Sequence, residues 1–287
     1  MIHTFLFPSD YFNKNKVDPA LYAEYDVCEK MNETIIIFSY KKWFENRIID
    51  LTAIPTKNTV VIYRGWMMTP EVYKEFYAAL KAYNITLIND PNTYNFMHIF
   101  PNVYKSIQED TAKTLTFSLH QSIDLNRIKA NGIHKFLVKD YVKSVKGSNF
   151  PSSFHVDMAQ KEFDNWMKLF YQYRGNLLTG GICIKEFLNL KHYGDKTNEY
   201  RVYYANHKIC SIAKNSNQDY LSPLPPEDLI LKYKNLPSNY YTIDYAQLED
   251  DSWIIIECGD GQVSGLSNSQ DYSEYYRNLI LCFNQPF

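Results

Sequence analysis

Apolar runs and amphipathic segments alternate along the first part of the chain. Two segments between the apolar runs predict helices: the polar segment 18–30, and the segment 71–83, whose apolar residues recur at helical spacing after Pro70. Segment 91–101 is expected to be a loop in which His98 is packed and hydrogen-bonded. Strands are predicted at the apolar runs Ile2 to Phe7, Thr34 to Phe38, Val60 to Tyr63 and Ile85 to Ile88. This alternation indicates an α/β lobe, which we place at residues 1–100.

The remainder of the chain, residues 101–287, has a different pattern, in which strand candidates follow one another more closely. Helices are expected over 102–113 and over 158–173, where large apolar side chains recur at helical spacing. The strand candidates are Phe136 to Val138, Ile182 to Leu188, a hairpin of Tyr200 to Ala205 with Lys208 to Ala213, Tyr240 to Ala246, and Trp253 to Ile256. The two parts together predict an α+β protein.

The last of these strands ends in acids and glycines, which makes its end the first candidate for a functional site. Glu257 and Asp260 follow the apolar run, with glycines at positions 259, 261 and 265. If Asp250 and Asp251 form a two-residue hairpin loop, Asp244 lies directly opposite Glu257, and two ionised carboxylates so placed repel each other. Such carboxylates suit Mg²⁺, with Asp260 as a third ligand. In another register they are ordinary solubilising residues of a hairpin.

A second candidate site follows the strand at 136–138. Lys139 ends this strand, and Lys143, Ser144, Lys146 and Gly147 come soon after it. Ammonium groups offset the charge of a polyphosphate, and exposed backbone N–H groups can donate to it. The chain has no GxxxxGK[ST] and no GxGxxG, so neither a Walker loop nor a dinucleotide fingerprint is present. These residues alone are compatible with a phosphate site and with a solvated basic turn.

Four further charged residues lie in or beside predicted strands. Lys185 and Glu186 are adjacent in an apolar strand, so their side chains point to opposite faces and at least one should face a cleft. Arg201 lies at the start of the predicted hairpin. Arg64 closes the third strand of the first lobe, where it is expected, taken alone, to be a surface arginine.

Composition limits the classes of function. Apolar residues make up 45% and charged residues 22%, as in ordinary globular proteins, and a net charge of −2 gives no broad basic surface for nucleic acid. No apolar segment is long enough to span a membrane and no signal-peptide core is present, so we expect a cytoplasmic protein without a membrane partner. The five cysteines are widely spaced and never CxxC, which favours reduced thiols over disulfides or a zinc site.

Three elements taken together resemble the ATP-grasp superfamily, and in particular a divergent clade of it. They are Arg-Gly-Trp at 64–66, Val-Lys-Asp-Tyr-Val-Lys-Ser at 138–144, and Glu-x-Gly-Asp-Gly-Gln-Val-Ser-Gly-Leu at 257–266. The resemblance implies an ATP-grasp domain at 101–287, in which two α+β subdomains that divide near residue 180 clamp ATP behind the N-terminal lobe. The chain departs from the family pattern at Gly259, where the family usually has an Asn metal ligand, and in a shortened glycine-rich loop at 143–147.

The resemblance also implies roles for individual residues. Arg201 would stabilise the transferred phosphoryl group, and Asp244 and Glu257 would hold Mg²⁺ with Asp260 close by. From the N-terminal lobe, Arg64 is hypothesised to grip the carboxylate substrate or a phosphate. The remaining assignments are phosphate contacts by Lys139, Lys143 and Ser144, and an adenine hinge of Lys185, Glu186, Phe187 and Leu188.

The usual chemistry of the resembled family is ATP-dependent carboxylate–amine ligation through an acylphosphate, with release of ADP and phosphate. For this chain it implies an ATP- and Mg²⁺-dependent ligase acting on a peptide, a protein or small metabolites. A second hypothesis is an ATP-binding assembly factor with little turnover, because the clade also resembles a eukaryotic protein that helps to assemble a translation initiation factor. A third, RNA ligation or another nucleotidyl transfer, would release AMP in place of ADP.

Overall fold

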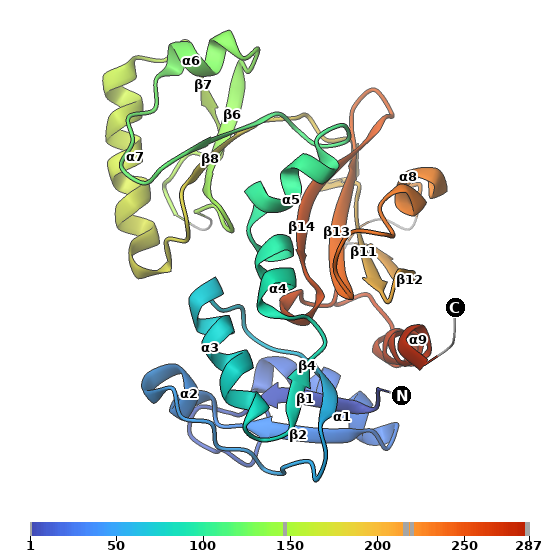
Figure 1. Ribbon diagram of the computed structural model, residues 1–287. Coiled ribbons are helices and arrows are strands. Elements are labelled where there is room, and N and C mark those ends of the chain that lie inside the picture. The colour runs from blue at the N-terminus through green and yellow to red at the C-terminus, as the bar shows by residue number, and fades with distance from the viewer. Residues whose placement is uncertain (1, 146–147, 215–217, 219–220, 285–287) are drawn as a thin grey trace.

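The structure is a computed structural model that describes residues 2–145, 148–214, 218 and 221–284. Lys146 and Gly147, at the end of the predicted phosphate segment, lie outside the described residues. The described strands form three four-stranded sheets and one two-stranded ribbon. In Figure 1 the N-terminal lobe lies at the bottom, and the two other four-stranded sheets lie above it, one on each side.

The N-terminal lobe is a parallel sheet with helices between its strands. The strands β1 (Thr4–Pro8), β2 (Thr34–Phe38), β3 (Thr59–Tyr63) and β4 (Ile85–Leu87) have the order β2-β1-β3-β4. The connecting helices are α1 (Tyr22–Lys30), α2 (Tyr40–Asn46) and α3 (Pro70–Lys81). Thr69 caps α3 by accepting from the N–H of Val72, and Pro70 occupies the first turn. The predicted alternation is confirmed, and α2 is an addition to it.

The segment predicted as a loop at 91–101 is helical. It contains α4 (Pro91–His98) and the beginning of α5 (Phe100–Ile107), which connect the N-terminal lobe to the next sheet. Asp90 caps α4 by accepting from the N–H of Thr93, and each helix has a proline in its first turn, where the missing N–H leaves no hydrogen bond unmade. The loop prediction was therefore wrong because these prolines begin helices.

The second sheet is antiparallel and packs against a long amphipathic helix. Its strands β5 (Thr114–Phe117), β6 (Lys135–Asp140), β7 (Phe154–His155) and β8 (Ile182–Glu186) have the order β5-β8-β6-β7. Its helices are α6 (Leu125–Ala130) and α7 (Gln160–Arg174). Phe163 and Phe170 of α7 share a core with Phe136 of β6, which confirms the apolar face predicted for this helix.

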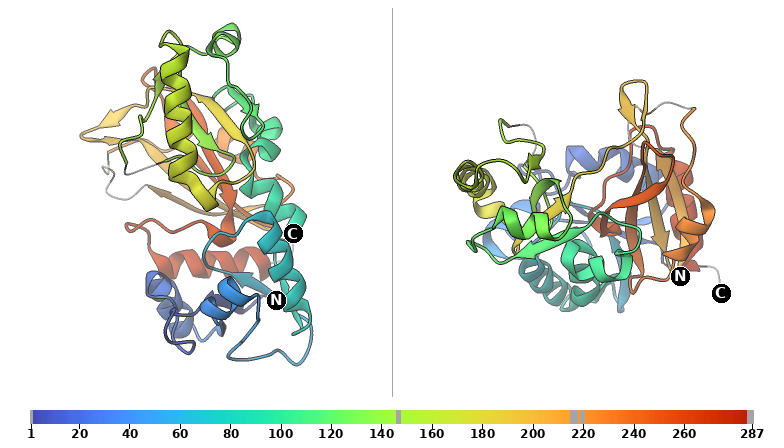
Figure 2. Two further views of the ribbon diagram at one scale, coloured as in Figure 1. Left: turned by 90° about the vertical axis from the view of Figure 1, so that its left-hand side faces the viewer. Right: turned by 90° about the horizontal axis from the view of Figure 1, so that it is seen from above.

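The third sheet is also antiparallel. Its strands β11 (Glu199–Ala205), β12 (Lys208–Lys214), β13 (Tyr240–Gln247) and β14 (Trp253–Asp260) have the order β12-β11-β13-β14. A ribbon of β9 (His192–Tyr193) and β10 (Lys196–Thr197) precedes it, and α8 (Glu227–Lys232) and α9 (Tyr272–Asn284) complete the fold. Helix α9 lies directly over the N-terminal lobe (Figure 2), where its Tyr276 stacks edge-on against Phe5. This contact joins α9, the helix that follows the third sheet in the chain, to β1 of the first sheet.

Two expectations from composition can be compared with the fold. All five cysteines are buried free thiols, as their spacing suggested. No helix in the described part of the chain is long and apolar enough to cross a membrane.

Strand β6 ends at Asp140, which is fully buried and fixes the loop that follows. Its carboxylate accepts from the N–H groups of Val142 at 2.7 Å and Lys143 at 2.6 Å. It also accepts from Nε of Arg174 at 2.8 Å and from the N–H of Thr179 at 3.2 Å. The side chain therefore holds the backbone that carries Lys143.

Replacing Asp140 by alanine should destabilise the protein strongly, because it leaves the Arg174 charge and two loop N–H groups without their partner. We expect the free energy of unfolding to fall by about 3–5 kcal/mol, measured by urea denaturation. The matched control is Asp157→Ala, which removes an exposed partner of Lys129 and should change stability little. Equal effects of the two substitutions on the free energy of unfolding would contradict the role of Asp140 in holding this loop.

Candidate active site

A cavity of about 490 Å³ lies between the second sheet and β14 of the third sheet. This volume lies in the range of small-molecule sites, about 300–1,000 Å³. Leu137 and Ile256 contribute apolar walls, and Asn189, His192 and Glu249 add polar groups that were not predicted. The predicted residues that line it are Lys139, Lys143, Ser144, Lys185, Glu186, Phe187, Leu188 and Glu257.

A second cavity, of about 90 Å³, shares Lys143 and Glu257 with the first. Arg201 and Asp244 of the third sheet line it, together with Met67 and His98 from the N-terminal part of the chain. The two cavities therefore place most of the predicted residues in one continuous region, with Lys143 and Glu257 where the cavities meet.

The predicted carboxylate pair is present. Asp244 of β13 lies directly opposite Glu257 of β14. The next pair is Tyr245 with Ile255, so Ile256 is an extra residue in β14, a β-bulge. The hairpin turn is longer than the predicted Asp250–Asp251 loop, since the last pair is Gln247 with Trp253. The predicted register at the site was right because the bulge compensates for the longer turn.

Lysines from the second sheet approach Glu257. Lys139 and Lys143 place their Nζ atoms 3.8 Å and 3.9 Å from the same carboxylate oxygen of Glu257. Burial opposes ionisation of Glu257, but the charges of Lys139, Lys143, Arg201 and Lys185 outweigh it and lower its pKa to about 2. Glu257 is therefore a carboxylate at neutral pH, in surroundings with an excess of positive charge.

Arg201 binds Asp244 in the geometry of a fork. Its Nε and Nη2 donate to the two carboxylate oxygens at 2.8 Å and 2.7 Å, and Nη1 donates to the carbonyl of Gly265 at 2.9 Å. A guanidinium has five N–H donors, so two remain for a ligand. The side chain keeps 27% exposure. Arg201 is thus fixed in place and still able to bind an anion.

Lys185 lies deep in the cavity wall. Its Nζ donates to the carbonyl of the bulged residue Ile256 at 2.6 Å and lies 4.4 Å from the centre of the Phe100 ring. Burial, followed by the nearby charge of Lys139, lowers the pKa of Lys185 to about 7. An anionic ligand beside it would favour the charged form.

The donor set fits a magnesium ion that arrives with a nucleotide. Asp244 and Glu257 offer hard oxygen ligands side by side, and Mg²⁺ is commonly held by one or two carboxylates together with substrate phosphates. Among the described residues, no group of three or more His, Cys, Asp or Glu side chains is arranged to hold a metal. The remaining ligands would therefore be phosphate oxygens and water.

The structure does not bring the carboxylate of Asp260 to this pair. Asp260 is three positions after Glu257, so along the strand its side chain lies on the opposite face. It is fully buried and accepts from Asn89 Nδ2 at 2.6 Å and from the backbone and side chain of Gln262. Burial raises its pKa to about 6. The expectation of Asp260 as a third ligand is contradicted by this placement.

Arg64 also lies elsewhere than predicted. It is 1% exposed, and all five of its N–H donors point to protein acceptors. Glu24 accepts from Nε at 2.7 Å and Nη2 at 3.0 Å. The other acceptors are the Tyr240 hydroxyl and the carbonyls of Gly261 and Ser264. With no free donor, Arg64 cannot grip a substrate, and it is not a surface arginine.

His98 combines a correct prediction with an incorrect one. Its ring stacks on Tyr94 with centroids 4.8 Å apart, as the packing expectation required. Its imidazole makes no hydrogen bond to the described residues, contrary to the prediction, and it lines the smaller cavity. Burial, with the charge of Lys143, lowers its pKa to about 4. No feature of the sequence placed this histidine or Met67 beside Glu257.

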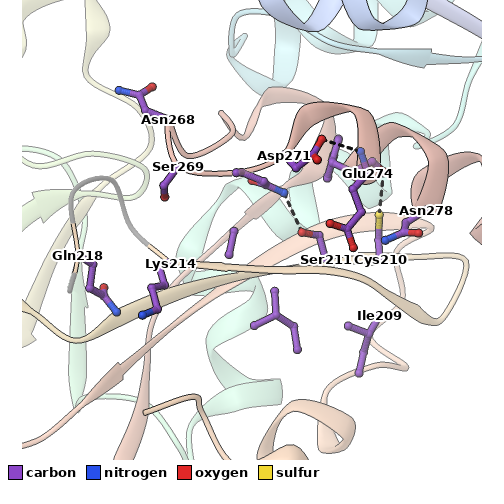
Figure 3. A pocket seen from close by; sticks show the side chains of 14 residues that line it. Ile209, Cys210, Ser211, Lys214, Gln218, Asn268, Ser269, Asp271, Glu274 and Asn278 are labelled. Carbon is purple, nitrogen blue, oxygen red and sulfur yellow. Dashed lines mark hydrogen bonds between the residues drawn. The ribbon is translucent and has the colours of Figure 1, made fainter. Parts of the chain in front are cut away.

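A third cavity, of about 910 Å³, lies away from these residues, between β12 and the start of α9 (Figure 3). Ser211 and Gln270 form a hydrogen bond of 2.8 Å across it. Its charged lining residues are Lys214, Asp271 and Glu274. Two carboxylates and one lysine do not suit a polyphosphate. The two connected cavities of about 490 Å³ and 90 Å³ are therefore the better candidate for a nucleotide site.

Comparison with known proteins identifies a family and several structures of the same fold. The family model for the ATP-grasp domain, R-2-K clade family 3, matches residues 130–279, which is more than half of the chain. No curated protein matches the chain.

Several solved structures share the fold. An ATP-grasp ligase, PsnB, complexed with a minimal precursor has a TM-score of 0.61 and 9% identity, over 98% of this chain and 99% of that one. D-cycloserine synthetase DcsG has a TM-score of 0.62 and 11% identity, over 96% and 98%. D-alanine–D-alanine ligase from Bacillus anthracis complexed with ATP has a TM-score of 0.57 and 11% identity, over 98% and 96%. The architecture is therefore the α+β ATP-grasp fold.

The lowered pKa of Lys185 predicts a pH-dependent stability. The unfolded chain has a lysine pKa of about 10.4, so between about pH 7 and that value the unfolded state binds more protons than the folded state. The contribution of Lys185 should therefore make the free energy of unfolding rise with pH across this window. Lys185→Met should reduce that rise, measured by urea denaturation at pH 7 and about pH 9.5.

The exposed Lys129 provides the control for this measurement, because Lys129→Met removes a lysine without removing a buried charge. It should leave the pH dependence nearly as in the wild type. A wild-type slope in Lys185→Met would show that Lys185 is not the titrating group.

Proposed function

Since the chain belongs to family 3 of the R-2-K clade of ATP-grasp domains, we propose that it is an ATP- and Mg²⁺-dependent carboxylate–amine ligase. The ligation would proceed through an acylphosphate and release ADP and phosphate. One observation carries the proposal: two carboxylates on neighbouring strands meet two lysines from the opposite sheet and one arginine with free donors, at the end of a cavity of nucleotide size.

In the first step, a carboxylate oxygen of the acid attacks the γ-phosphorus of ATP, and the bond to the ADP oxygen breaks. Lys139 and Lys143 would bind the phosphates, and the two remaining N–H donors of Arg201 would contact the transferred phosphoryl group. Asp244 and Glu257 would hold Mg²⁺, which supplies charge compensation on the phosphate oxygens. These residues bind and orient charge, and none of them becomes covalently attached to a substrate.

In the second step, the amine attacks the carbonyl carbon of the acylphosphate. The C–N bond forms, the C–O bond to phosphate breaks, and phosphate leaves with the bonding pair while the amine loses a proton. Both substrates would reach the reacting atoms through the smaller cavity, which Met67 and His98 border. The nucleotide base would lie at the other end of the cavity of about 490 Å³, beside Glu186, Phe187 and Leu188.

A peptide or protein is our preferred substrate class. The structural relative PsnB is an ATP-grasp ligase seen with its precursor peptide PsnA2 and AMPPNP, and with a minimal precursor, Mg and ADP. The D-alanine–D-alanine ligases that share the fold keep small amino acids as the alternative. In both classes the proposed chemistry is the formation of an amide bond from an acid and an amine.

Glu257→Gln should abolish turnover, because the amide is a poor ligand for Mg²⁺ and leaves the lysines without their counter-charge. We expect ADP release that depends on an added acid to fall by about 100-fold or more. ADP would be measured with a panel of acids, amines and peptides. Cells that express wild-type protein should also contain a peptide or protein mass change that is absent with Glu257→Gln.

The control is Glu75→Gln, an exposed glutamate paired with Arg47 on the surface, which should turn over normally. Release of AMP would overturn the proposal in favour of nucleotidyl transfer. Tight ATP binding without turnover, together with a stable complex with a protein partner, would favour the assembly factor.

A further inference from the structure

We propose that the N-terminal lobe positions Glu257 through the turn at 260–265, and that Arg64 is the principal positioning residue. The inference rests on the proposed function, since it takes Glu257 to be a ligand of nucleotide-bound Mg²⁺. The groups proposed to hold the turn, Arg64 with Glu24 and Asn89, lie outside the segment 130–279 matched by the family model.

Glu257 lies near the end of an edge strand. In its sheet β14 pairs only with β13, and the parallel bridge of Thr111 with Ile255 supports it before the bulge and not after it. Beyond Asp260 the chain leaves the sheet in a 3₁₀ helix at Gly261–Val263. From Glu257 to Asp260 the strand is held in its sheet by β13 alone, so the groups that hold the turn give the strand end a second support.

Groups of the N-terminal lobe hold it. The guanidinium of Arg64 donates to the carbonyl of Gly261, and to that of Ser264 at 2.8 Å. The N–H of Gly65 donates to the carbonyl of Gln262 at 3.2 Å. Asn89 contributes a further bond through Nδ2 to the carboxylate of Asp260 at 2.6 Å. The residues that follow β3 and β4 thus hold the turn from the side of the N-terminal lobe, while Arg201 and Tyr203 of β11 hold its end from the third sheet.

The turn has little room to move away from this arrangement. A Cβ atom at Gly261 would lie 2.7 Å from the Tyr240 ring, so the backbone packs directly against that ring. The Tyr240 hydroxyl in turn accepts from Nη1 of Arg64 at 3.4 Å. The arginine and the ring therefore contact the same glycine.

Arg64 is itself fixed by two helices from opposite ends of the chain. Glu24 of α1 accepts two of its N–H groups and also accepts from the hydroxyl of Tyr276 of α9 at 2.5 Å. The side chains of Arg64 and Glu24 are 2% and 7% exposed. A buried ion pair of this kind is costly to break, and its hydrogen bonds specify one geometry. This network therefore connects the N-terminal lobe to the end of β14, the strand that carries Glu257.

Arg64→Lys tests the positioning role, because lysine keeps the charge but cannot bind Glu24 and both carbonyls at once. The measurement is the affinity for ADP by calorimetry, with Mg²⁺ and with EDTA. We expect the gain in ADP affinity due to Mg²⁺ to fall by about tenfold or more, with magnesium-free affinity nearly unchanged. A merely structural role would lower stability without changing this gain.

Phe76→Leu is the control, since Phe76 is a fully buried core residue of the N-terminal lobe that takes no part in the hydrogen bonds of the turn. It should lower thermal stability and leave the magnesium-dependent gain as in the wild type. If Arg64→Lys does not fold, Tyr276→Phe and Asn89→Ala each remove polar contacts from the same network. Each should then reduce the gain by about fivefold.

Two outcomes would overturn the inference, and they can be told apart. A wild-type gain in folded Arg64→Lys, or in both milder variants, overturns the positioning role and leaves the proposed ligase untouched. A wild-type protein whose ADP affinity does not respond to Mg²⁺ overturns the metal site of the proposed function, and the inference with it.

Discussion

Two carboxylates directly opposite each other on neighbouring strands are the constraint on which the site depends. Asp244 and Glu257 carry like charges at close range, so their surroundings have to supply positive charge. Arg201 meets this need within the same sheet, and Lys139 and Lys143 meet it from the second sheet. The carboxylate pair therefore connects the two antiparallel sheets electrostatically across the cavity.

The cations around Glu257 exceed what the carboxylates alone require. Lys139, Lys143, Lys185 and Arg201 all favour its ionised form, and burial costs Lys185 much of its own tendency to be charged. A site with this balance attracts an anion more than a bare metal ion. A nucleotide with its magnesium would satisfy both requirements.

Much of the fold could be predicted from local patterns, and the exceptions have identifiable physical causes. The strand runs and α7 followed from periodicity. Helix α4 was missed because Pro91 looked like a loop residue, whereas α5 was predicted with other bounds, 102–113 instead of 100–107. The pairing of Asp244 with Glu257 was predicted from the strand register, whereas the association of Lys139, Lys143 and Arg201 with this pair was implied by the resemblance to the ATP-grasp superfamily. The register was right only because a bulge at Ile256 offset a longer turn, and no sequence pattern shows a bulge of this kind.

The errors in the site have a common cause, which is burial by another lobe. Asp260 and Arg64 were read as exposed functional charges, since nothing in the sequence shows that Asn89 and Glu24 cover them. Side-chain direction also separates Asp260 from Glu257, because three positions along a strand reverse the face. Tertiary partners far away in the sequence decided both cases.

The buried ion pair of Arg64 and Glu24 also bears on how such proteins can diversify. The N-terminal lobe borders the proposed substrate cavity through Met67, so exchanging this lobe between relatives is an obvious way to exchange specificity. Yet the lobe also supplies hydrogen bonds to the turn at 260–265, through Arg64, Gly65 and Asn89. A transplanted lobe would need a matching turn and a matching α9, so the three segments would have to be exchanged together.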